Sequence, residues 1–242
     1  MIVYKHITYI VPGFNFRGNI YNLLQGFREQ KNSNFSVEII DDASTDDSLK
    51  EYLHQVDLVK LGFPCAFTRN VEKKFALRNI VEMAVSKRID DIIAIVDADD
   101  CLCNPNATDL VLAAYNDGAD IVWTAHKWDV DERMNVSKAL PVNVDPYQYP
   151  WCASHLRTFR VSELNKINVA NFKDVNGNYF ERGYDQSLML PLLKVAKDRR
   201  YINEVCYLYK IDSVSIPKEL RNYNEVKQLT TVSFVRARGF VI

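Results

Sequence analysis

The residues with the clearest chemical potential are three aspartates at the end of an apolar run. Asp97, Asp99 and Asp100 follow directly on residues 92–96, whose continuous apolar character predicts a central buried strand. Three carboxylates this close together repel one another strongly unless a cation lies among them. Mg²⁺ or Mn²⁺, held by one or two carboxylates and the phosphates of a substrate, would meet that need. The alternative is that these aspartates only cap the next helix or lie solvated in a turn.

Two further polar segments follow predicted strands in the same way. Asp41 and Asp42 come after the stretch at 37–40, and residues 12–15 come after the stretch at 6–11. In open α/β sheets, ligands bind beyond the carboxyl ends of the strands. Because two acidic segments end two strands of one predicted sheet, we interpret them as a site for a metal ion and a diphosphate rather than as isolated helix caps.

Strands and helices alternate along the first half of the chain. The pattern predicts strands at 6–11, 37–40, 58–61 and 92–96, and helices at 19–30, 47–54 and 74–87. Alternation of this kind favours an α/β fold with a mostly parallel, Rossmann-like sheet flanked by helices. The second half is less regular and predicts helices at 107–116 and 184–196, the latter kinked by Pro191, and strands at 120–124, 151–159 and 203–209.

The composition bounds the remaining possibilities. The chain has 242 residues, 48% of them hydrophobic, which is enough for one continuous globular unit. With 30 basic and 31 acidic residues, the net charge of -1 provides no global field for a nucleic acid or an anionic membrane. The five cysteines lack zinc-ligand spacing. Because the sequence shows no secretory signal and no membrane-spanning stretch, we expect a cytoplasmic protein with no stable membrane insertion. Peripheral association with a membrane stays open.

Three segments carry a family resemblance. YIVPGFN, VEIIDDASTDDS and IAIVDADD resemble the successive nucleotide-sugar motifs of the family 2 glycosyltransferases, which have the GT-A fold of the nucleotide-diphospho-sugar transferase superfamily. The likeness is close over about the first half of the chain and loose over the second. It implies a single GT-A domain over residues 1–242, with a nucleotide-sugar-binding half at 1–103 and an acceptor-binding half at 104–242.

The resemblance also assigns residues to the donor. It implies that the Asp41–Asp42 pair recognises uridine, with Asp42 favoured as the contact to the base. It also implies that one carboxylate of the Asp97–Asp99 motif binds the ribose and a neighbour binds the metal, Mn²⁺ or Mg²⁺, which we assign to Asp99 or Asp100. The residues that it places around the nucleotide are Pro12, Gly13, Phe14, Asp41, Asp42, Lys73, Arg78, Asp97 and Asp99.

The segment between the second and third motifs fits the family less closely. The Arg78–Asn79 pair is kept, but the glycine that often precedes it is absent and the spacing is longer. Lys73 either approaches the nucleotide or is a solvated lysine at the start of a helix.

Glycosyl transfer with inversion needs a carboxylate that removes the proton of the acceptor. The segment ERGYDQSLMLPLL resembles the family's late motif, in which an acid at the start of a helix is the catalytic base, and the matching residue is Asp185. Glu181 is the reserve candidate. Asp185 also has the sequence position of a helix N-cap, and a helix N-terminus can hold a carboxylate ionised.

The segment WCASHLRTFR lies where the family builds the floor of its acceptor site. Trp151 could stack on a sugar or a base, and His155, Arg157 or Arg160 could bind a diphosphate or an acidic acceptor. Each also has an interpretation as a packing or surface residue. The polar, basic segment at 213–225 is interpreted as a mobile segment that closes over the donor.

The sequence thus predicts an inverting, metal-dependent transferase that uses a nucleotide-sugar donor, with UDP-sugar favoured by the paired aspartates. The acceptor is a saccharide or another hydroxyl compound, and a nucleic-acid acceptor is possible but not indicated. The alternatives are a non-catalytic sugar-nucleotide-binding module and a sugar nucleotidyltransferase. For the latter, VPGFNFRGN is a poor match to the expected glycine-rich signature.

Overall fold

The computed structural model describes residues 6–58, 61–129, 135–210 and 218–242. The strands are β1 (Ile7–Gly13), β2 (Phe35–Asp41), β3 (Cys65–Arg69), β4 (Ile92–Ile95), β5 (Cys101–Leu102), β6 (Ile121–Trp128), β7 (Arg157–Arg160) and β8 (Arg199–Tyr209). The helices are α1 (Ile20–Arg28), α2 (Ser48–Leu58), α3 (Phe75–Val85), α4 (Ala107–Asn116), α5 (Val161–Leu164), α6 (Tyr184–Val195) and α7 (Lys218–Arg238), with 3-10 turns η1 (Arg17–Asn19) and η2 (Val169–Phe172).

The strands form one sheet in the order β3-β2-β1-β4-β7-β6-β8-β5. The first four strands are parallel, as predicted, and β6 is parallel to β8. β7 runs antiparallel to both of its neighbours, with Arg157 beside Ile95 in the register. The start of β7, rather than its end, therefore lies at the edge where β1, β2 and β4 end.

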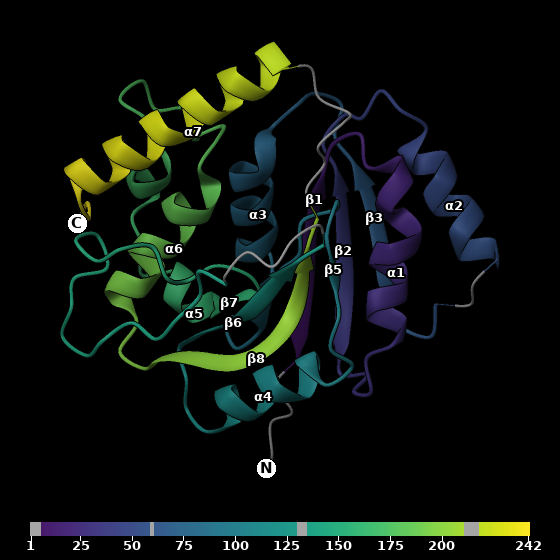
Figure 1. Cartoon of the computed structure of the whole chain (residues 1–242), viewed down its shortest axis with the longest axis horizontal. Helices are drawn as coiled ribbons and strands as arrows, with labels where there is room; N and C mark the ends of the chain where they lie inside the picture. The colour runs from purple at the N-terminus through teal and green to yellow at the C-terminus, as the bar shows by residue number, and fades with distance from the viewer. Residues whose placement is uncertain (1–5, 59–60, 130–134, 211–217) are drawn as a thin grey trace.

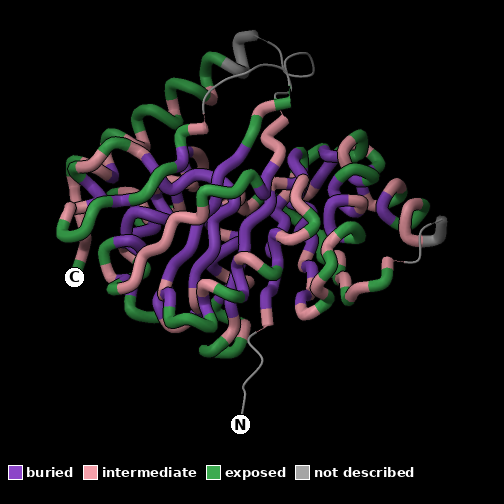
Figure 2. The backbone as a smooth tube through the Cα atoms, turned by 60° about the horizontal axis from the view of Figure 1, so that its bottom comes forward, coloured by how far each residue is buried: buried purple, intermediate pink, exposed green. Residues whose placement is uncertain are grey.

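Helices cover both faces of the sheet, so its strands are buried on both sides (Figures 1 and 2). Successive residues of β4 point to opposite faces: Ile93 and Ile95 pack with α3, α5 and α6, whereas Ile92 and Ala94 pack with α1 and α4. This burial explains why β4 reads as a continuous apolar run rather than an alternating one.

α7 crosses α6 at the C-terminal end of the chain (Figure 1). Val235 reaches the core, and two arginines tie the end of the helix to neighbouring loops. Arg236 donates to the carbonyls of Tyr147 and Tyr149, and Arg238 donates to three carbonyls at residues 170–173. In the described part of the chain, no helix is both long and apolar enough to cross a membrane.

The predicted strand at 58–61 was wrong, because Leu58 ends α2 and the third strand is β3, an edge strand whose mixed polarity hides it. Residues 59–60 lie outside the described residues. The strand predicted at 151–159 begins only at Arg157.

The helix α7 was missed because most of its residues are polar. The segment predicted to be mobile contributes residues 218–225 to this helix, while residues 213–217 lie outside the described residues.

The contact between α1 and β5 gives a prediction about packing. A Cβ added at Gly26 would lie 2.7 Å from the carbonyl oxygen of Leu102, whereas one at Gly18 would meet nothing within 4 Å. Because overpacking costs about 1–3 kcal/mol, more than the gain of up to about 1 kcal/mol in helix propensity, Gly26→Ala should lower the free energy of unfolding by about 1–2 kcal/mol. Urea denaturation would measure this, and Gly18→Ala should stay near wild type. Equal effects of the two substitutions would contradict the close approach.

Candidate active site at the strand ends

The ends of β1, β2 and β4 lie side by side around Gly13. The amide of Asp42 donates to the Gly13 carbonyl at 2.8 Å, and the amide of Ala98 donates to the Pro12 carbonyl at 3.3 Å. A Cβ at Gly13 would lie 2.5 Å from that of Ala98, so this approach needs glycine. The two acidic segments that the sequence singled out therefore flank one short stretch of backbone.

The carboxylate of Asp42 is buried and caps α3 from outside the helix. Its oxygens accept hydrogen bonds from the amides of Lys74 and Phe75, both at 2.8 Å, and from the side chains of Asn70 at 2.9 Å and Asn79 at 3.0 Å. Asp42 thereby fixes the start of α3 beside the strand ends. Its contact to a uridine base stays a prediction.

Asp41 is also buried and belongs to a separate local cluster. One oxygen accepts from the amide of Ser44 at 2.8 Å, and the other lies 3.5 Å from Arg69 Nε. An open hollow of about 600 Å³ adjoins this cluster and is lined by residues 44–50, Leu53 and Arg69 together with Asp41. No residue that follows β4 or precedes α6 lines it, so this hollow is distinct from the surroundings of Asp97.

Three residues without glycine's freedom adopt positive φ near these strand ends. Asn15 has φ 55° after β1, Ala43 has φ 62° after β2, and Phe75 has φ 63° at the start of α3. Such conformations are unfavourable for side chains other than glycine, and they gather at functional sites, where the surrounding structure enforces them.

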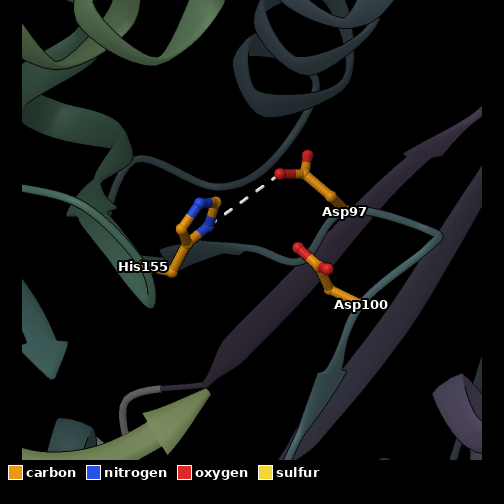
Figure 3. A group of neighbouring side chains, drawn as sticks. All are labelled: Asp97, Asp100 and His155. Atoms are coloured by element: carbon orange, nitrogen blue, oxygen red, sulfur yellow. Dashed lines mark ion pairs between the residues drawn. The ribbon is translucent and has the colours of Figure 1, made fainter. Parts of the chain in front are cut away.

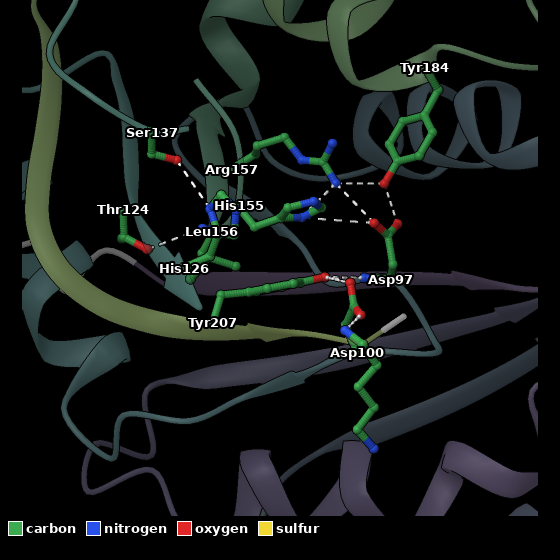
Figure 4. A network of polar contacts seen from close by, with 11 residues as sticks. Asp97, Asp100, Thr124, His126, Ser137, His155, Leu156, Arg157, Tyr184 and Tyr207 are labelled. Atoms are coloured by element: carbon green, nitrogen blue, oxygen red, sulfur yellow. Dashed lines mark hydrogen bonds and ion pairs between the residues drawn. The ribbon is translucent and has the colours of Figure 1, made fainter. Parts of the chain in front are cut away.

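Asp97 is held by a buried guanidinium. Arg157 Nη2 donates to one Asp97 oxygen at 3.1 Å, and the Tyr184 hydroxyl donates to the other (Figure 4). Arg157 is 1% exposed, and its Nη2 also lies 3.2 Å from His155 Nδ1 and 2.6 Å from the Tyr184 hydroxyl. Burial opposes the charge of Arg157, but Tyr184, Asp97 and Asp185 raise its pKa, so the guanidinium stays protonated. The network joins β7, the end of β4 and the start of α6.

Asp100 lies in the same turn and is bonded to β8 and to the residue that follows it. It accepts from the Tyr207 hydroxyl at 2.8 Å and from the amide of Lys210 at 2.7 Å. The Tyr207 hydroxyl also accepts from the amide of Asp97 at 2.9 Å, so it connects the turn to β8. Burial, with added repulsion from Asp99 and Asp97, raises the pKa of Asp100 to about 9. This carboxyl is therefore neutral at pH 7.

Ligand atoms of Asp97, Asp100 and His155 lie within 4.8 Å of one another, which is close enough for a metal ion (Figure 3). However, the Arg157 guanidinium already bonds to both Asp97 and His155. Burial, followed by Arg157 and His126, lowers the pKa of His155, so this histidine is neutral and accepts from Arg157. A divalent cation bound between these three residues would lie beside the buried positive charge of Arg157. Their repulsion argues against a metal ion at this position.

Carboxylates in the turn still fit a hard divalent cation. Asp99 is exposed, and Asp97 keeps 19% of its side chain accessible despite its bond to Arg157. Oxygen donors two residues apart at a strand end suit Mg²⁺ or Mn²⁺ that is completed by substrate phosphates. Of the predicted metal ligands, Asp99 fits this arrangement, whereas the oxygens of Asp100 are already bonded to Tyr207 and Lys210.

Asp185 lies in the first turn of α6, which begins after Gly183 in a left-handed conformation (φ 68°). It is half-buried, and its carboxyl bonds to the backbone amides of Asp185 and Gln186 but to no described side chain. Burial raises the pKa of Asp185, and Arg157 partly offsets the effect. Because Tyr184 contacts Asp97, Asp185 is held next to the acidic strand end. The reserve candidate, Glu181, instead pairs with Lys227 of α7.

The other predicted residues have varied surroundings. Arg78 pairs with Glu82 at 2.7 Å on the surface of α3. Trp151 packs, partly buried, against the hydrophobic core. Arg160 donates to the carbonyls of Ala119 and Tyr115, which is a structural role.

Sequence reasoning missed Tyr184 and Tyr207. Tyr184 had a signal, because it lies beside Asp185 in the late motif. Tyr207 had none, because only the sheet order brings β8 to the turn after β4.

The contrast between Asp97 and Asp100 gives a paired prediction. Asp97→Asn leaves Arg157 buried without its counter-charge, and should lower the free energy of unfolding by about 3 kcal/mol. Asp100→Asn should instead stabilise the protein. The pKa of Asp100 is about 9 in the folded protein, above its ordinary value of 3.8. Between these two pH values Asp100 is ionised only in the unfolded chain, so the free energy of unfolding falls as pH rises.

The check is calorimetry at pH 5 and pH 8 without divalent ions. We expect the Tm of Asp100→Asn to exceed that of wild type, and by more at pH 8. The control is Asp90→Asn, an exposed position on the loop before β4. A lower Tm for Asp100→Asn at both pH values would show that Asp100 is ionised in the folded protein.

Comparisons with known proteins agree with this arrangement. The model of glycosyl transferase family 2 matches residues 8–173, more than half of the chain. None of the curated proteins matches the sequence.

Several solved structures share the fold at low sequence identity. S. aureus TarS 1-349 in complex with UDP-GlcNAc is 17% identical with a TM-score of 0.65, over 97% of this chain and 71% of that one. A longer S. aureus TarS structure is 14% identical with a TM-score of 0.63, over 93% of this chain and 43% of that one. The mannosyltransferase PcManGT from Pyrobaculum calidifontis, in complex with GDP-Man and Mn²⁺, is 17% identical with a TM-score of 0.61, over 96% and 65%. The chain belongs to glycosyl transferase family 2 and has the GT-A fold.

Proposed function

We propose that this glycosyltransferase acts with inversion, moving a sugar from a UDP-sugar donor to an acceptor hydroxyl, with Asp185 as the general base. One observation carries the proposal. The Tyr184 hydroxyl bonds to Asp97, so the half-buried carboxyl of Asp185, without a bonding partner among described side chains, lies beside the predicted donor site. A base close to the donor is what single displacement requires.

The protonation behaviour of Asp185 supports the role. Its pKa is raised because the carboxyl is buried, which makes it a better proton acceptor than a solvated aspartate. Arg157 opposes the shift and so favours the ionised form of the carboxyl, which is the form that accepts a proton. The base therefore depends on the same guanidinium that neutralises Asp97.

The donor side is proposed from the residues around the strand ends. Asp99 and Asp97 would hold Mn²⁺ or Mg²⁺, which when bound stabilises the negative charge of the departing diphosphate. Asp97 keeps an accessible edge for the ribose, and the exposed ring of Phe14 follows β1. Residues 1–103 thus form the nucleotide-sugar-binding half of the proposed enzyme and residues 104–242 its acceptor-binding half.

The relatives support a nucleotide sugar without fixing the base or the ion. TarS was solved with UDP-GlcNAc, and PcManGT with GDP-Man and Mn²⁺. We favour uridine because of the Asp41–Asp42 pair, although both side chains are engaged within the protein.

The acceptor site has less support. His155 and Arg157 are buried in the network around Asp97, whereas Trp151 packs against the core and Arg160 bonds to backbone carbonyls. A saccharide or another hydroxyl compound remains our proposed acceptor. A non-catalytic module is the alternative, and it would have no need of a half-buried acid at position 185 that pairs with no described side chain.

The catalytic role is tested by Asp185→Asn. This change keeps the shape of the side chain and removes the base, so kcat for sugar transfer or donor hydrolysis should fall by about 10²- to 10⁴-fold while UDP binding stays unchanged. Glu181→Gln is the control and should retain activity, because Glu181 pairs with Lys227. Full activity of Asp185→Asn in assays with UDP-GlcNAc and GDP-Man would exclude Asp185 as the base.

The metal role is tested by thermal stabilisation. A ligand that binds only the folded protein raises Tm, and UDP at about 100 times its Kd contributes about 2.7 kcal/mol. We expect UDP with Mn²⁺ to raise the Tm of wild type more than UDP alone, and Asp99→Asn to lose the Mn²⁺-dependent part. Asp90→Asn should keep it. A Tm shift by UDP that is equal with Mn²⁺ and with EDTA would rule out the ion.

A further inference from the structure

Two cations lie close to the ring of Phe75 at the start of α3. Lys73 Nζ lies 5.4 Å from the centre of the Phe75 ring, and the guanidinium carbon of Arg182 lies 5.7 Å from it. Lys73 Nζ also lies 3.2 Å from the centre of the Phe14 ring, which is 41% exposed. One cation thus comes from the segment before α3, and the other from the segment before α6.

Neither cation is neutralised within the described part of the chain, where neither forms an ion pair. The nearby acids are committed elsewhere, since Asp42 caps α3 and Glu181 pairs with Lys227. Burial lowers the pKa of Lys73, and the charge of Arg182 lowers it further. Two positive groups held close together without a counter-charge repel each other. An anion bound between them would remove this electrostatic repulsion.

The position of Arg182 is set by α7. Its Nε donates to Asn224 Oδ1 at 3.1 Å. The next residue, Gly183, has φ 68°, and a Cβ there would lie 3.3 Å from the carbonyl oxygen of Gln228. The segment before α6 is therefore packed against α7, and Arg182 is directed towards Phe75.

The location of the pair indicates which anion it takes. Lys73 stands over Phe14, directly after β1, and Arg182 precedes Tyr184, whose hydroxyl bonds to Asp97 after β4. The two cations therefore lie beside the strand ends that the proposed donor would occupy. Arginine and lysine together suit phosphate oxygens, the first by paired hydrogen bonds and the second as a point charge.

We propose that Lys73 and Arg182 form a two-cation clamp for the diphosphate of the donor nucleotide, with Asn224 of α7 orienting Arg182. The inference rests on the proposed function, and it makes the second half of the chain a contributor to donor binding.

Calorimetric titration of UDP, uridine and inorganic pyrophosphate tests the clamp. We expect Lys73→Met and Arg182→Met each to weaken UDP and pyrophosphate at least 10-fold and to leave uridine unchanged. Asn224→Ala should weaken UDP by a smaller factor, and Arg182→Lys should recover part of the loss. Lys197→Met is the matched control, because Lys197 is exposed beyond the other end of α6. Tm without ligand shows whether each variant is folded.

The outcomes separate the clamp from the proposed function. UDP binding that is equal in Arg182→Met and Lys197→Met would overturn the clamp and leave the transferase proposal standing. Equal weakening of uridine and UDP would also overturn it, since the loss would then not concern phosphate. If wild type binds pyrophosphate but neither UDP nor uridine, and the variants lose pyrophosphate, the two cations bind a diphosphate and the proposed UDP-sugar donor is wrong.

Discussion

The arrangement of the candidate site depends on one buried ion pair, between Arg157 and Asp97. Three aspartates follow β4 within four positions, and nothing in that turn balances their charge. The sheet supplies the balance, because β7 runs antiparallel beside β4 and brings Arg157 level with Ile95. Arg157 has almost no exposure, so its charge acts at short range with little screening by solvent. The same guanidinium reaches Tyr184, and so the start of α6 is fixed relative to the strand end.

Three neighbouring aspartates acquire three different physical states from this arrangement. Asp97 is paired with Arg157, whereas burial beside Tyr207 and Lys210 keeps Asp100 neutral. Asp99 is the exposed member of the group. Pairing of Asp97 with Arg157 and protonation of Asp100 thus relieve the repulsion that the sequence suggests. The exposed Asp99 and the accessible edge of Asp97 are the carboxylates that suit a metal.

The sequence predicted the parallel part of the fold because β1, β2 and β4 are apolar and each is followed by polar residues. It also predicted that these ends share one site, which the contacts around Gly13 agree with. It could not predict the order of β7, β6 and β8, because the pairing of an antiparallel strand between two others leaves no local sequence pattern. The start of β7 was therefore predicted too early in the chain. For the same reason, neither the bond from Tyr207 to Asp100 nor the position of Arg157 was foreseeable. The sequence did not predict α7, because a helix on the surface of the fold needs few apolar residues.

The boundary that the motifs suggest at residue 103 does not divide the site. Asp42 fixes the start of α3 and with it Phe75, while α7 holds the segment that carries Arg182 to that ring. Asp97 likewise depends on Arg157 and Tyr184 from the second half. An enzyme whose donor site is completed by distant segments must fold both halves before it can bind, so neither half is expected to hold a nucleotide sugar alone. In the proposed donor site, the aspartates of the first half therefore act together with the cations Arg157 and Arg182 of the second half.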